Sequence, residues 1–383
     1  MSECYTRGRT MWAVGGRVRA RAFVLILSIC ACAPGGGVAG TASPPAAPTI
    51  TDTVIQSGLT VPWDVAVAPD GRLFVTERPG TISIFESTSP MAKRVTTAQV
   101  AGIRAMGEAG LLGLALDPDF PTNGLLYVCA SRVDQGEWRN QILRYRSSGA
   151  SLALESMVLR AGPAAAGIHD ACRLRFGPDR KLWVATGDAG QGAEAQSGTS
   201  LNGKVLRINT DGTVPDDNPT LKGASAPGLV YALGLRNPGG LAFHPDTGAC
   251  YVVDVGDQMQ DEIDLVTPGA NFGWPLVLGP GGSSRGFADP AWSSGTVSSA
   301  LAGAAFVSGD MWGSWSGSLL VATLKDQDLR RFSVDGETVL QHEVLLDRRY
   351  GRMRAATTAP DGALLVTTSN GNADRVIRIA RSP

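Results

Sequence analysis

The feature that most constrains the fold is a phrase that recurs along the chain. It reads as a strand, a Pro-Asp turn, a second strand and, after a gap, a third strand, as in "WDVAVAPDGRLFVTE" followed by "TISIF". Proline and aspartate are residues that turns of this kind prefer. Clear copies occupy residues 63–77, 113–131, 173–188, 240–257 and 353–371, and a degenerate copy occupies 317–334. Because a unit made only of strands must bury its faces against its neighbours, six copies predict an all-β, six-bladed β-propeller over residues 51–383.

Residues 1–40 have a different character. Arginines precede the short apolar run "AFVLILSICACA", and small residues follow it. This order is typical of an export signal, so we expect a periplasmic or extracellular protein, with residues 41–50 as a flexible linker. Three fates of the signal are open: cleavage after Gly40, cleavage with a lipid anchor on Cys32, or retention as an uncleaved apolar anchor.

The charge and the cysteines narrow the class of protein. The formal net charge is −1 and 18% of the residues are charged, which excludes the basic surface that nucleic acid requires. The six cysteines show neither the close spacing of a disulfide framework nor that of a zinc site. Cys129 and Cys250 lie in apolar, strand-like runs, where we expect them in the core.

Two segments place chemically useful residues just before a strand of the repeat. His169, with Arg173 after it, precedes the third copy, and Arg236-Asn237 hold the equivalent place before the fourth. A histidine can accept a proton from a hydroxyl, and an arginine can stabilise negative charge that develops on a ligand oxygen. The alternative for both is structural: the histidine fills a turn and the arginine binds loop carbonyls.

A third segment, residues 253–275, is dense in carboxylates around Gly256, Asp257 and Glu262. Oxygen ligands in a flexible loop suit Ca²⁺, although the spacing is not that of an EF-hand. The alternative interpretation is a solvated acidic loop.

The fourth feature is cationic and consists of Lys325 with Arg352 and Arg354. A spacing of two at the start of a strand directs both guanidinium groups to one face. Together with the lysine they would hold a polycarboxylate ligand through paired hydrogen bonds. The alternative is three solvated surface cations.

Taken together, these segments resemble the soluble sugar dehydrogenases that use pyrroloquinoline quinone (PQQ), the glucose/sorbosone dehydrogenase family. The resemblance covers about residues 55–381 and rests on "GLLGLALDPDF", "GKVLRINTDGTVPDDNP", "GLRNPGGLAFHPDTG", "DEIDLVTPGANFGWP" and "GRMRAATTAPDG", in that order. It implies a six-bladed propeller that carries PQQ over its channel. It also implies oxidation of an aldose or related alcohol outside the cytoplasm, with an exported electron acceptor.

The resemblance assigns roles to individual residues. His169 corresponds to the general base that takes the hydroxyl proton while hydride passes to the quinone, and Arg236 to the arginine beside the quinone carbonyl. The other implied cofactor contacts are Asn237, Lys325, Arg352 and Arg354. The implied Ca²⁺ ligands are the carbonyls of Gly256 and Asp257 for the cofactor's ion, and Glu262 with the carbonyl of Phe272 for a structural ion.

The chain also departs from the pattern of the sugar-oxidising members. Val255 and Asp257 stand where those members have His or Gln and then Pro, the residues 171–172 replace a glycine pair, and Ile168 replaces an acidic residue. We therefore do not narrow the substrate to glucose. Two other functions stay open: a cofactor-free propeller that acts as a binding module, as in the hedgehog-interacting relatives, and, less strongly, a Ca²⁺-dependent lactonase.

Overall fold

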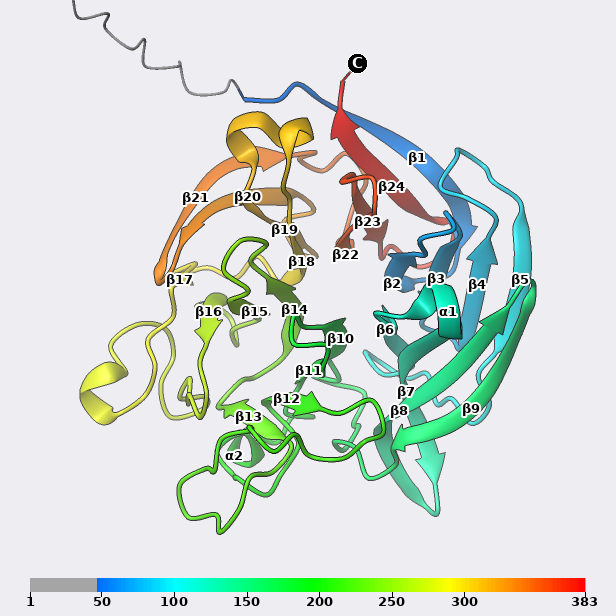
Figure 1. Ribbon diagram of the computed structural model, residues 1–383. Coiled ribbons are helices and arrows are strands. Elements are labelled where there is room, and N and C mark those ends of the chain that lie inside the picture. Colours follow the sequence, from blue (N-terminus) through cyan, green and yellow to red (C-terminus); the bar gives the residue numbers. More distant parts are fainter. Residues whose placement is uncertain (1–46, 383) are drawn as a thin grey trace, which may run out of the picture. The chain divides into compact units, whose positions relative to one another are not determined.

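The computed structural model describes residues 47–382, which form six four-stranded antiparallel sheets arranged as blades around a central axis (Figure 1). The innermost strands of neighbouring blades contact one another around the ring. The prediction of an all-β, six-bladed propeller is confirmed. The predicted export signal, Cys32 and most of the predicted linker lie outside the described residues.

Each of the first three blades in chain order is a four-stranded meander. Written from the innermost strand outward, they are β2 (Pro62–Val67), β3 (Leu73–Glu77), β4 (Thr81–Phe85) and β5 (Arg94–Gln99); β6 (Leu111–Leu116), β7 (Leu125–Asp134), β8 (Glu137–Ser148) and β9 (Ser151–Leu159); and β10 (Cys172–Phe176), β11 (Leu182–Thr186), β12 (Lys204–Ile208) and β13 (Val230–Leu233).

The remaining blades follow the same plan. They are β14 (Pro238–Phe243), β15 (Cys250–Asp254), β16 (Glu262–Val266) and β17 (Trp292–Ser293); β18 (Leu301–Phe306), β19 (Leu319–Thr323), β20 (Leu329–Asp335) and β21 (Thr338–Leu345); and β22 (Met353–Thr358), β23 (Leu364–Thr368), β24 (Asp374–Arg381) and β1 (Ile50–Leu59). Short helices lie between strands: α1 (Phe120–Asn123), α2 (Gly192–Ala195), η1 (Ser283–Arg285) and η2 (Asp310–Trp315). No helix within residues 47–382 is long and apolar enough to cross a membrane.

The first strand closes the ring. β1 pairs antiparallel with β24 from Ile50 opposite Arg381 onward, so the last blade takes its outermost strand from the beginning of the described chain. In Figure 1 the blue β1 lies beside the red β24. Joining the two ends of the chain in one sheet ties the last blade to the first, which is how a propeller avoids an open ring.

In the clear copies, the repeat phrase becomes the first two strands of a blade and the turn between them. Every residue of β11, β19 and β23 is buried, because a blade is covered by neighbours on both faces. In the first blade the Pro-Asp turn is closed by the Gly71 N–H on the Ala68 carbonyl, at 2.8 Å, with Gly71 at φ 90°. The degenerate copy forms β19 and β20, as predicted.

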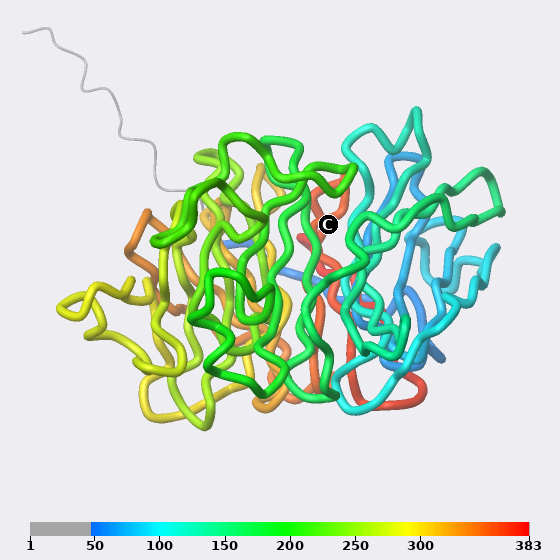
Figure 2. Tube along the Cα trace, turned by 90° about the horizontal axis from the view of Figure 1, so that it is seen from below, coloured from blue at the N-terminus to red at the C-terminus, as the bar shows by residue number. Residues whose placement is uncertain are grey.

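One face of the ring collects the loops that matter for function. Because successive strands alternate in direction, the loops that enter innermost strands and the loops between second and third strands meet at the same end of the blades; we call this end the site face. Figure 2, turned by 90° from Figure 1, shows the chain passing repeatedly between the two faces. The site-face loops used below are 100–110, 160–171, 187–203, 234–237, 255–261, 324–328 and 346–352.

Residues 132–140 form the ordered end of the β7–β8 hairpin. Val133 pairs with Trp138 and Asp134 with Glu137, so the two strands continue past the length of the other blades to a two-residue turn. The hairpin extends the second blade beside the loop that holds His169.

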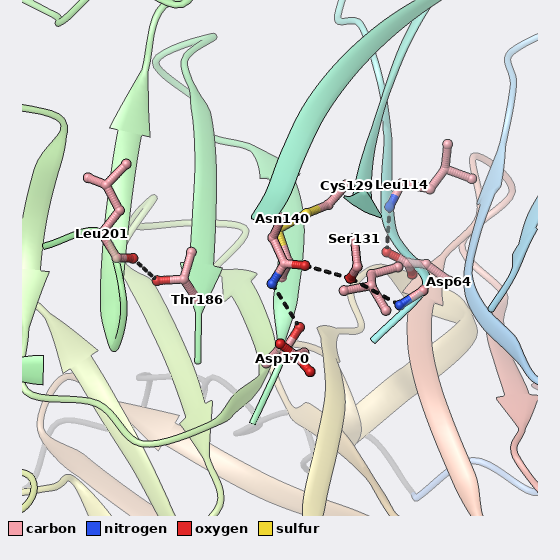
Figure 3. Close-up of a disulfide and its surroundings, with 12 residues drawn as sticks. Asp64, Leu114, Cys129, Ser131, Asn140, Asp170, Thr186 and Leu201 are labelled. Carbon is pink, nitrogen blue, oxygen red and sulfur yellow. Dashed lines mark hydrogen bonds between the residues drawn. A yellow bond between two sulfur atoms is a disulfide. The ribbon is translucent and has the colours of Figure 1, made fainter. Parts of the chain in front are cut away.

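A disulfide corrects the cysteine analysis. Cys129 of β7 and Cys172 of β10 are bonded, with 6.1 Å between their Cα atoms, which links the second and third blades (Figure 3). Spacing could not reveal this bond, because its cysteines belong to different repeats that only the ring brings together. Cys129 and Cys250 are buried, as expected, and Cys250 is a free thiol.

Candidate active site

His169 lies in the 160–171 loop and has a positive φ of 49°, a left-handed turn conformation. Its Nδ1 lies 2.7 Å from Oδ1 of Asp188, and the histidine side chain is 12% exposed. The same carboxylate accepts the N–H of Gly190 at 2.7 Å and the indole N–H of Trp274 at 2.8 Å. A buried carboxylate that accepts the Nδ1 proton fixes the tautomer and leaves the Nε2 lone pair free to accept a proton.

The sequence analysis missed Asp188. A signal existed in the repeat, because acidic residues end or follow the second strand in three blades, as Glu77, Asp188 and Asp254. Each of them accepts hydrogen bonds from a neighbouring turn of the site face. Glu77, for example, accepts the Thr60 N–H at 2.7 Å. Reading these positions as one repeated feature would have pointed to Asp188.

Arg236 and Asn237 occupy the turn before β14. Their backbone N–H groups donate to the buried carboxylate of Asp254, at 2.7 and 2.6 Å. Burial, above all, raises the pKa of Asp254 to about 6. The Arg236 guanidinium donates to the Val255 carbonyl at 3.2 Å and pairs with the Asp257 carboxylate at 3.1 Å. Asp254 thus holds the turn in place through the backbone of Arg236 and Asn237.

These residues surround an open cavity of about 460 Å³ on the site face, which we call the outer cavity. It brings together six of the sequence-predicted residues from four loops: His169, Arg236, Asn237, Gly256, Asp257 and Lys325. Glu108 and Ile168, which carry no predicted role, also line it. Glu108 accepts a hydrogen bond from the Asn237 amide at 3.0 Å.

A smaller and more enclosed cavity of about 170 Å³, the inner cavity, lies next to it and shares Glu108, Asn237, Val255 and Ala300 with it. Arg352 and Arg354 line this inner cavity together with Arg173, Asp170 and Trp63. The predicted convergence of the two arginines two residues apart is therefore present. The predicted site residues divide between two adjoining spaces.

Three cationic side chains of these cavities are not paired with carboxylates of the described chain. Within residues 47–382, Lys325, Arg352 and Arg354 form no ion pair, and the Arg354 Nε donates only to the Ser369 hydroxyl, at 3.1 Å. The burial of Arg354 and its neighbouring arginines lower its pKa to about 10, while Glu108 opposes that shift. Glu108 and Asp170 line the same cavity but form no ion pair with Arg352 or Arg354, so these guanidinium groups are available to bind an anionic ligand.

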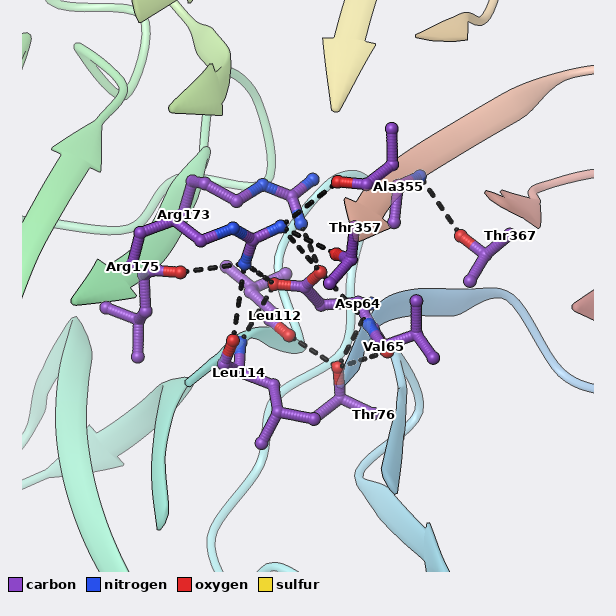
Figure 4. Close-up of polar contacts among 12 residues, drawn as sticks. Asp64, Val65, Thr76, Leu112, Leu114, Arg173, Arg175, Ala355, Thr357 and Thr367 are labelled. Carbon is purple, nitrogen blue, oxygen red and sulfur yellow. Dashed lines mark hydrogen bonds and ion pairs between the residues drawn. The ribbon is translucent and has the colours of Figure 1, made fainter. Parts of the chain in front are cut away.

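Arg173 has a different environment. It is 1% exposed, pairs with Asp64 at 2.7 Å and donates to the Gly239 carbonyl at 2.9 Å. Arg175 binds the other oxygen of Asp64 at 2.9 Å and the hydroxyl of Thr357 (Figure 4). Burial opposes ionisation of Asp64, yet the two arginines hold its pKa below the usual value. Arg173, grouped with His169 from the sequence, thus shares the Asp64 carboxylate with Arg175 in a network that joins blades across the channel.

Glu262 and Phe272 lie apart from both cavities. Glu262 faces Asp254 across the β15–β16 ladder and accepts the Gly279 N–H at 2.7 Å. Burial, above all, raises the pKa of Glu262 to about 8, and both carboxylate oxygens of the buried Asp264 lack a hydrogen-bond partner. Phe272 is buried and its N–H binds the Leu233 carbonyl. In the described part of the chain, no three His, Cys, Asp or Glu side chains are arranged to hold a metal ion.

Comparison with known proteins places this site in a family. Residues 59–378 match the sequence profile of the Glucose / Sorbosone dehydrogenase family. The chain belongs to this family. Among its relatives, the aldose sugar dehydrogenase YliI of Escherichia coli is 30% identical over 343 residues, which cover 85% of this chain and 92% of the relative.

Solved structures agree with the assignment. The PQQ-bound form of an aldose sugar dehydrogenase from Streptomyces coelicolor is 30% identical, with a TM-score of 0.73, and covers 87% of this chain and all of its own. The apo-form of the soluble aldose sugar dehydrogenase of E. coli is 28% identical, with a TM-score of 0.74 and the same coverage. The resemblance drawn from the sequence is confirmed at the level of the family.

The residues in which this chain departs from the sugar-oxidising members of the glucose/sorbosone dehydrogenase family are located at the site. Val255 lines both cavities, Ala171 lines the inner one and Ile168 the outer one. Cys172 is bonded to Cys129 and so is part of the scaffold. The departures therefore change the surface that a ligand would meet.

Proposed function

We propose that the protein is a PQQ-dependent dehydrogenase that oxidises a hydroxyl group of an aldose or related alcohol. The observation that carries the proposal is a histidine base, His169, oriented by the buried carboxylate of Asp188 on the outer cavity. The adjoining inner cavity is lined by Arg352 and Arg354, which form no ion pair within the described residues. Family membership and the PQQ-bound relative support the same chemistry.

The residues present fit the cofactor. PQQ carries three carboxylates, and Arg352 and Arg354, with Lys325 in the adjoining cavity, are cations without ion-pair partners in the described chain. Asn237 lines both cavities, and Arg236 lines the outer one on the side of the base. When bound there, PQQ would supply the hydride acceptor, which no side chain provides.

The chain's own residues supply the proton chemistry and the positioning. His169 Nε2 accepts the proton of the substrate hydroxyl, and Asp188 stabilises the imidazolium that results. The backbone of Arg236 is held by Asp254. Its guanidinium supplies a positive charge that stabilises negative charge developing on a ligand oxygen. Asn237 and Glu108, bonded to each other, complete the polar wall between the cavities.

Calcium belongs to the same proposal. The carbonyls of Gly256 and Asp257 are the proposed ligands of an ion beside the cofactor, since both residues line the outer cavity. Glu262 and the Phe272 carbonyl are proposed for a structural ion, supported by the unpartnered oxygens of the buried Asp264 nearby in β16. Oxygen donors of this kind are those that Ca²⁺ prefers.

We also propose that the protein works outside the cytoplasm and passes electrons to an exported acceptor. The sequence of residues 1–40 has the pattern of an export signal, and the Cys129–Cys172 disulfide is a bond that oxidising compartments maintain. A lipid on Cys32 is the proposed route of any membrane attachment.

The test is a titration of the purified protein with PQQ and Ca²⁺, followed by the cofactor spectrum, and then a panel of aldoses and alcohols with a dye acceptor. We expect saturable binding and dye reduction.

The His169→Ala variant should bind PQQ normally and lose about 10³-fold in kcat, because the general base is gone. Asp188→Asn should lose about 10²-fold, because the tautomer is no longer fixed. Wild-type turnover by His169→Ala would refute the assignment of the base.

The ion pair between Arg236 and Asp257 favours a second function, a cofactor-free binding propeller. The Asp257 carboxylate occupies the Arg236 guanidinium, which is the group proposed to contact the quinone. Absence of PQQ binding in the same titration, with restoration by Asp257→Pro, would support this alternative over the dehydrogenase.

A further inference from the structure

One wall of the outer cavity continues into an apolar surface. Ile168 and Met106 are each about half exposed, at 49% and 48%, although both have large apolar side chains. Trp138, near the tip of the β7–β8 hairpin, is partly exposed as well. We call Met106, Trp138 and Ile168 the apolar strip.

Met106 and Trp138 lie against Gly167, the residue that precedes Ile168 in the turn before the base. A Cβ atom placed on Gly167 would lie 3.3 Å from the Met106 Cε and 3.5 Å from the Trp138 Cη2, so both side chains contact the residue that precedes Ile168. Gly167 has a φ of 80°, a conformation that glycine tolerates. The apolar strip therefore has two parts: Met106 and Trp138 lie around Gly167, and Ile168, the next residue along the chain, lines the outer cavity beside His169.

Backbone hydrogen bonds fix the strip. The Ala165 N–H binds the Trp138 carbonyl at 3.0 Å, and the Glu108 N–H binds the Gly167 carbonyl at 3.0 Å. The Arg104 guanidinium lies 4.3 Å from the Trp138 ring centroid. A strip tied to both neighbouring loops is a preformed contact surface, and it needs no rearrangement to receive a ligand.

The outer cavity is thus polar on one side and apolar on the other. Lys325, Arg236 and Asp257 supply charge, whereas Ile168 is the half-exposed apolar side chain adjacent to the base. A free hexose has no apolar group to place against Ile168, so its binding would leave the apolar surface of that side chain without an apolar partner. An apolar substituent there would instead remove exposed apolar surface from water on both partners.

We propose that the substrate is amphipathic, an aldose-type head that carries an alkyl or acyl group, and that the apolar strip binds this group. The proposal rests on the proposed function, since the head presents the hydroxyl that His169 deprotonates. Ile168 is then a residue that determines specificity.

The first experiment compares D-glucose with 6-O-octanoyl-D-glucose in the dye assay. We expect the acylated sugar to have a kcat/KM about tenfold higher, consistent with burial of a few methylene groups. Ile168→Asp should abolish most of that ratio. The matched control is Val344→Asp, at a side chain 47% exposed on β21, the outermost strand of its blade, and it should leave the ratio unchanged. A wild-type ratio of one or below, or an equal loss for both sugars in Ile168→Asp, would overturn the proposal.

A binding measurement separates this proposal from the proposed function. Methyl 6-O-octanoyl-β-D-glucoside carries the same acyl group at the same position but has a blocked anomeric hydroxyl, so without a dye acceptor its affinity can be measured by calorimetry without turnover. We expect binding that Ile168→Asp and Trp138→Ala each weaken about tenfold and Val344→Asp leaves unchanged. If no sugar reduces the dye but the glucoside binds in this way, the apolar strip stands and the dehydrogenase proposal fails. If glucose is oxidised but Ile168→Asp and Trp138→Ala change neither the oxidation of the acylated sugar nor the binding of the glucoside, the role of the apolar strip is refuted and the dehydrogenase proposal stands.

Discussion

Two pairs of arginines in this ring have the same spacing and opposite environments. Arg173 and Arg175 lie on the innermost strand β10, and Arg352 and Arg354 lie at the start of the innermost strand β22. The first pair binds Asp64 of β2, two blades away around the ring, whereas the second pair has no carboxylate within ion-pair distance in the described chain. A compensated pair stabilises the ring, and an uncompensated pair is available to a ligand. Arginine spacing alone does not distinguish the two.

The largest expected effect is on the compensated pair. Asp64→Ala leaves the buried Arg173 and the partly exposed Arg175 without their anion and should lower the free energy of unfolding by about 3–5 kcal/mol at pH 7, as measured by urea titration. Asp361→Ala is the matched control, because its pair with Arg378 is exposed and should contribute less than about 1 kcal/mol. Equal losses in the two variants would contradict a structural role for the Asp64 network.

The uncompensated pair should behave in the opposite way. The double variant Arg352→Ala/Arg354→Ala should weaken PQQ binding about 100-fold, the loss of two charge-assisted hydrogen bonds, in a spectroscopic titration. Its free energy of unfolding should stay within about 1 kcal/mol of the wild type, because no carboxylate loses a partner. Arg375→Ala, at an exposed arginine of β24, is the control for affinity. Unchanged affinity in the double variant would remove these arginines from the cofactor site.

The smallest expected effect concerns an uncompensated acid of the inner cavity. Burial, above all, raises the pKa of Asp170 from 3.8 to about 6, and its Oδ2 has no hydrogen-bond partner. The folded protein therefore binds more protons than the unfolded chain between about pH 4 and 6, and this group lowers stability as pH rises through that window. Asp170→Asn should gain about 1–2 kcal/mol relative to wild type between pH 4 and pH 7 in unfolding titrations. A difference that does not depend on pH would contradict the shift.

Much of the fold could be predicted because its turns and strands depend on residues that are close together in the sequence. The Pro-Asp turn and its flanking apolar strands recur, so even the degenerate copy at 317–334 was recognisable as β19 and β20. The candidate residues stood out for a related reason: His169 and Arg236 hold equivalent places in consecutive repeats. The roles assigned to them from the family stay predictions until the variants are measured.

What the sequence could not specify was which residues meet. It determined that strands, turns and a ring would form, because turn chemistry and strand burial depend on near neighbours. The tertiary structure decided that Asp188 orients His169, that Asp64 neutralises Arg173, and that Cys129 bonds Cys172. These contacts join different loops or different blades, and a repeat that describes one blade contains no information about the side chains its neighbours direct at it. The charge balance at the channel, and with it the distinction between a structural arginine and a ligand-binding one, arises only when the ring closes.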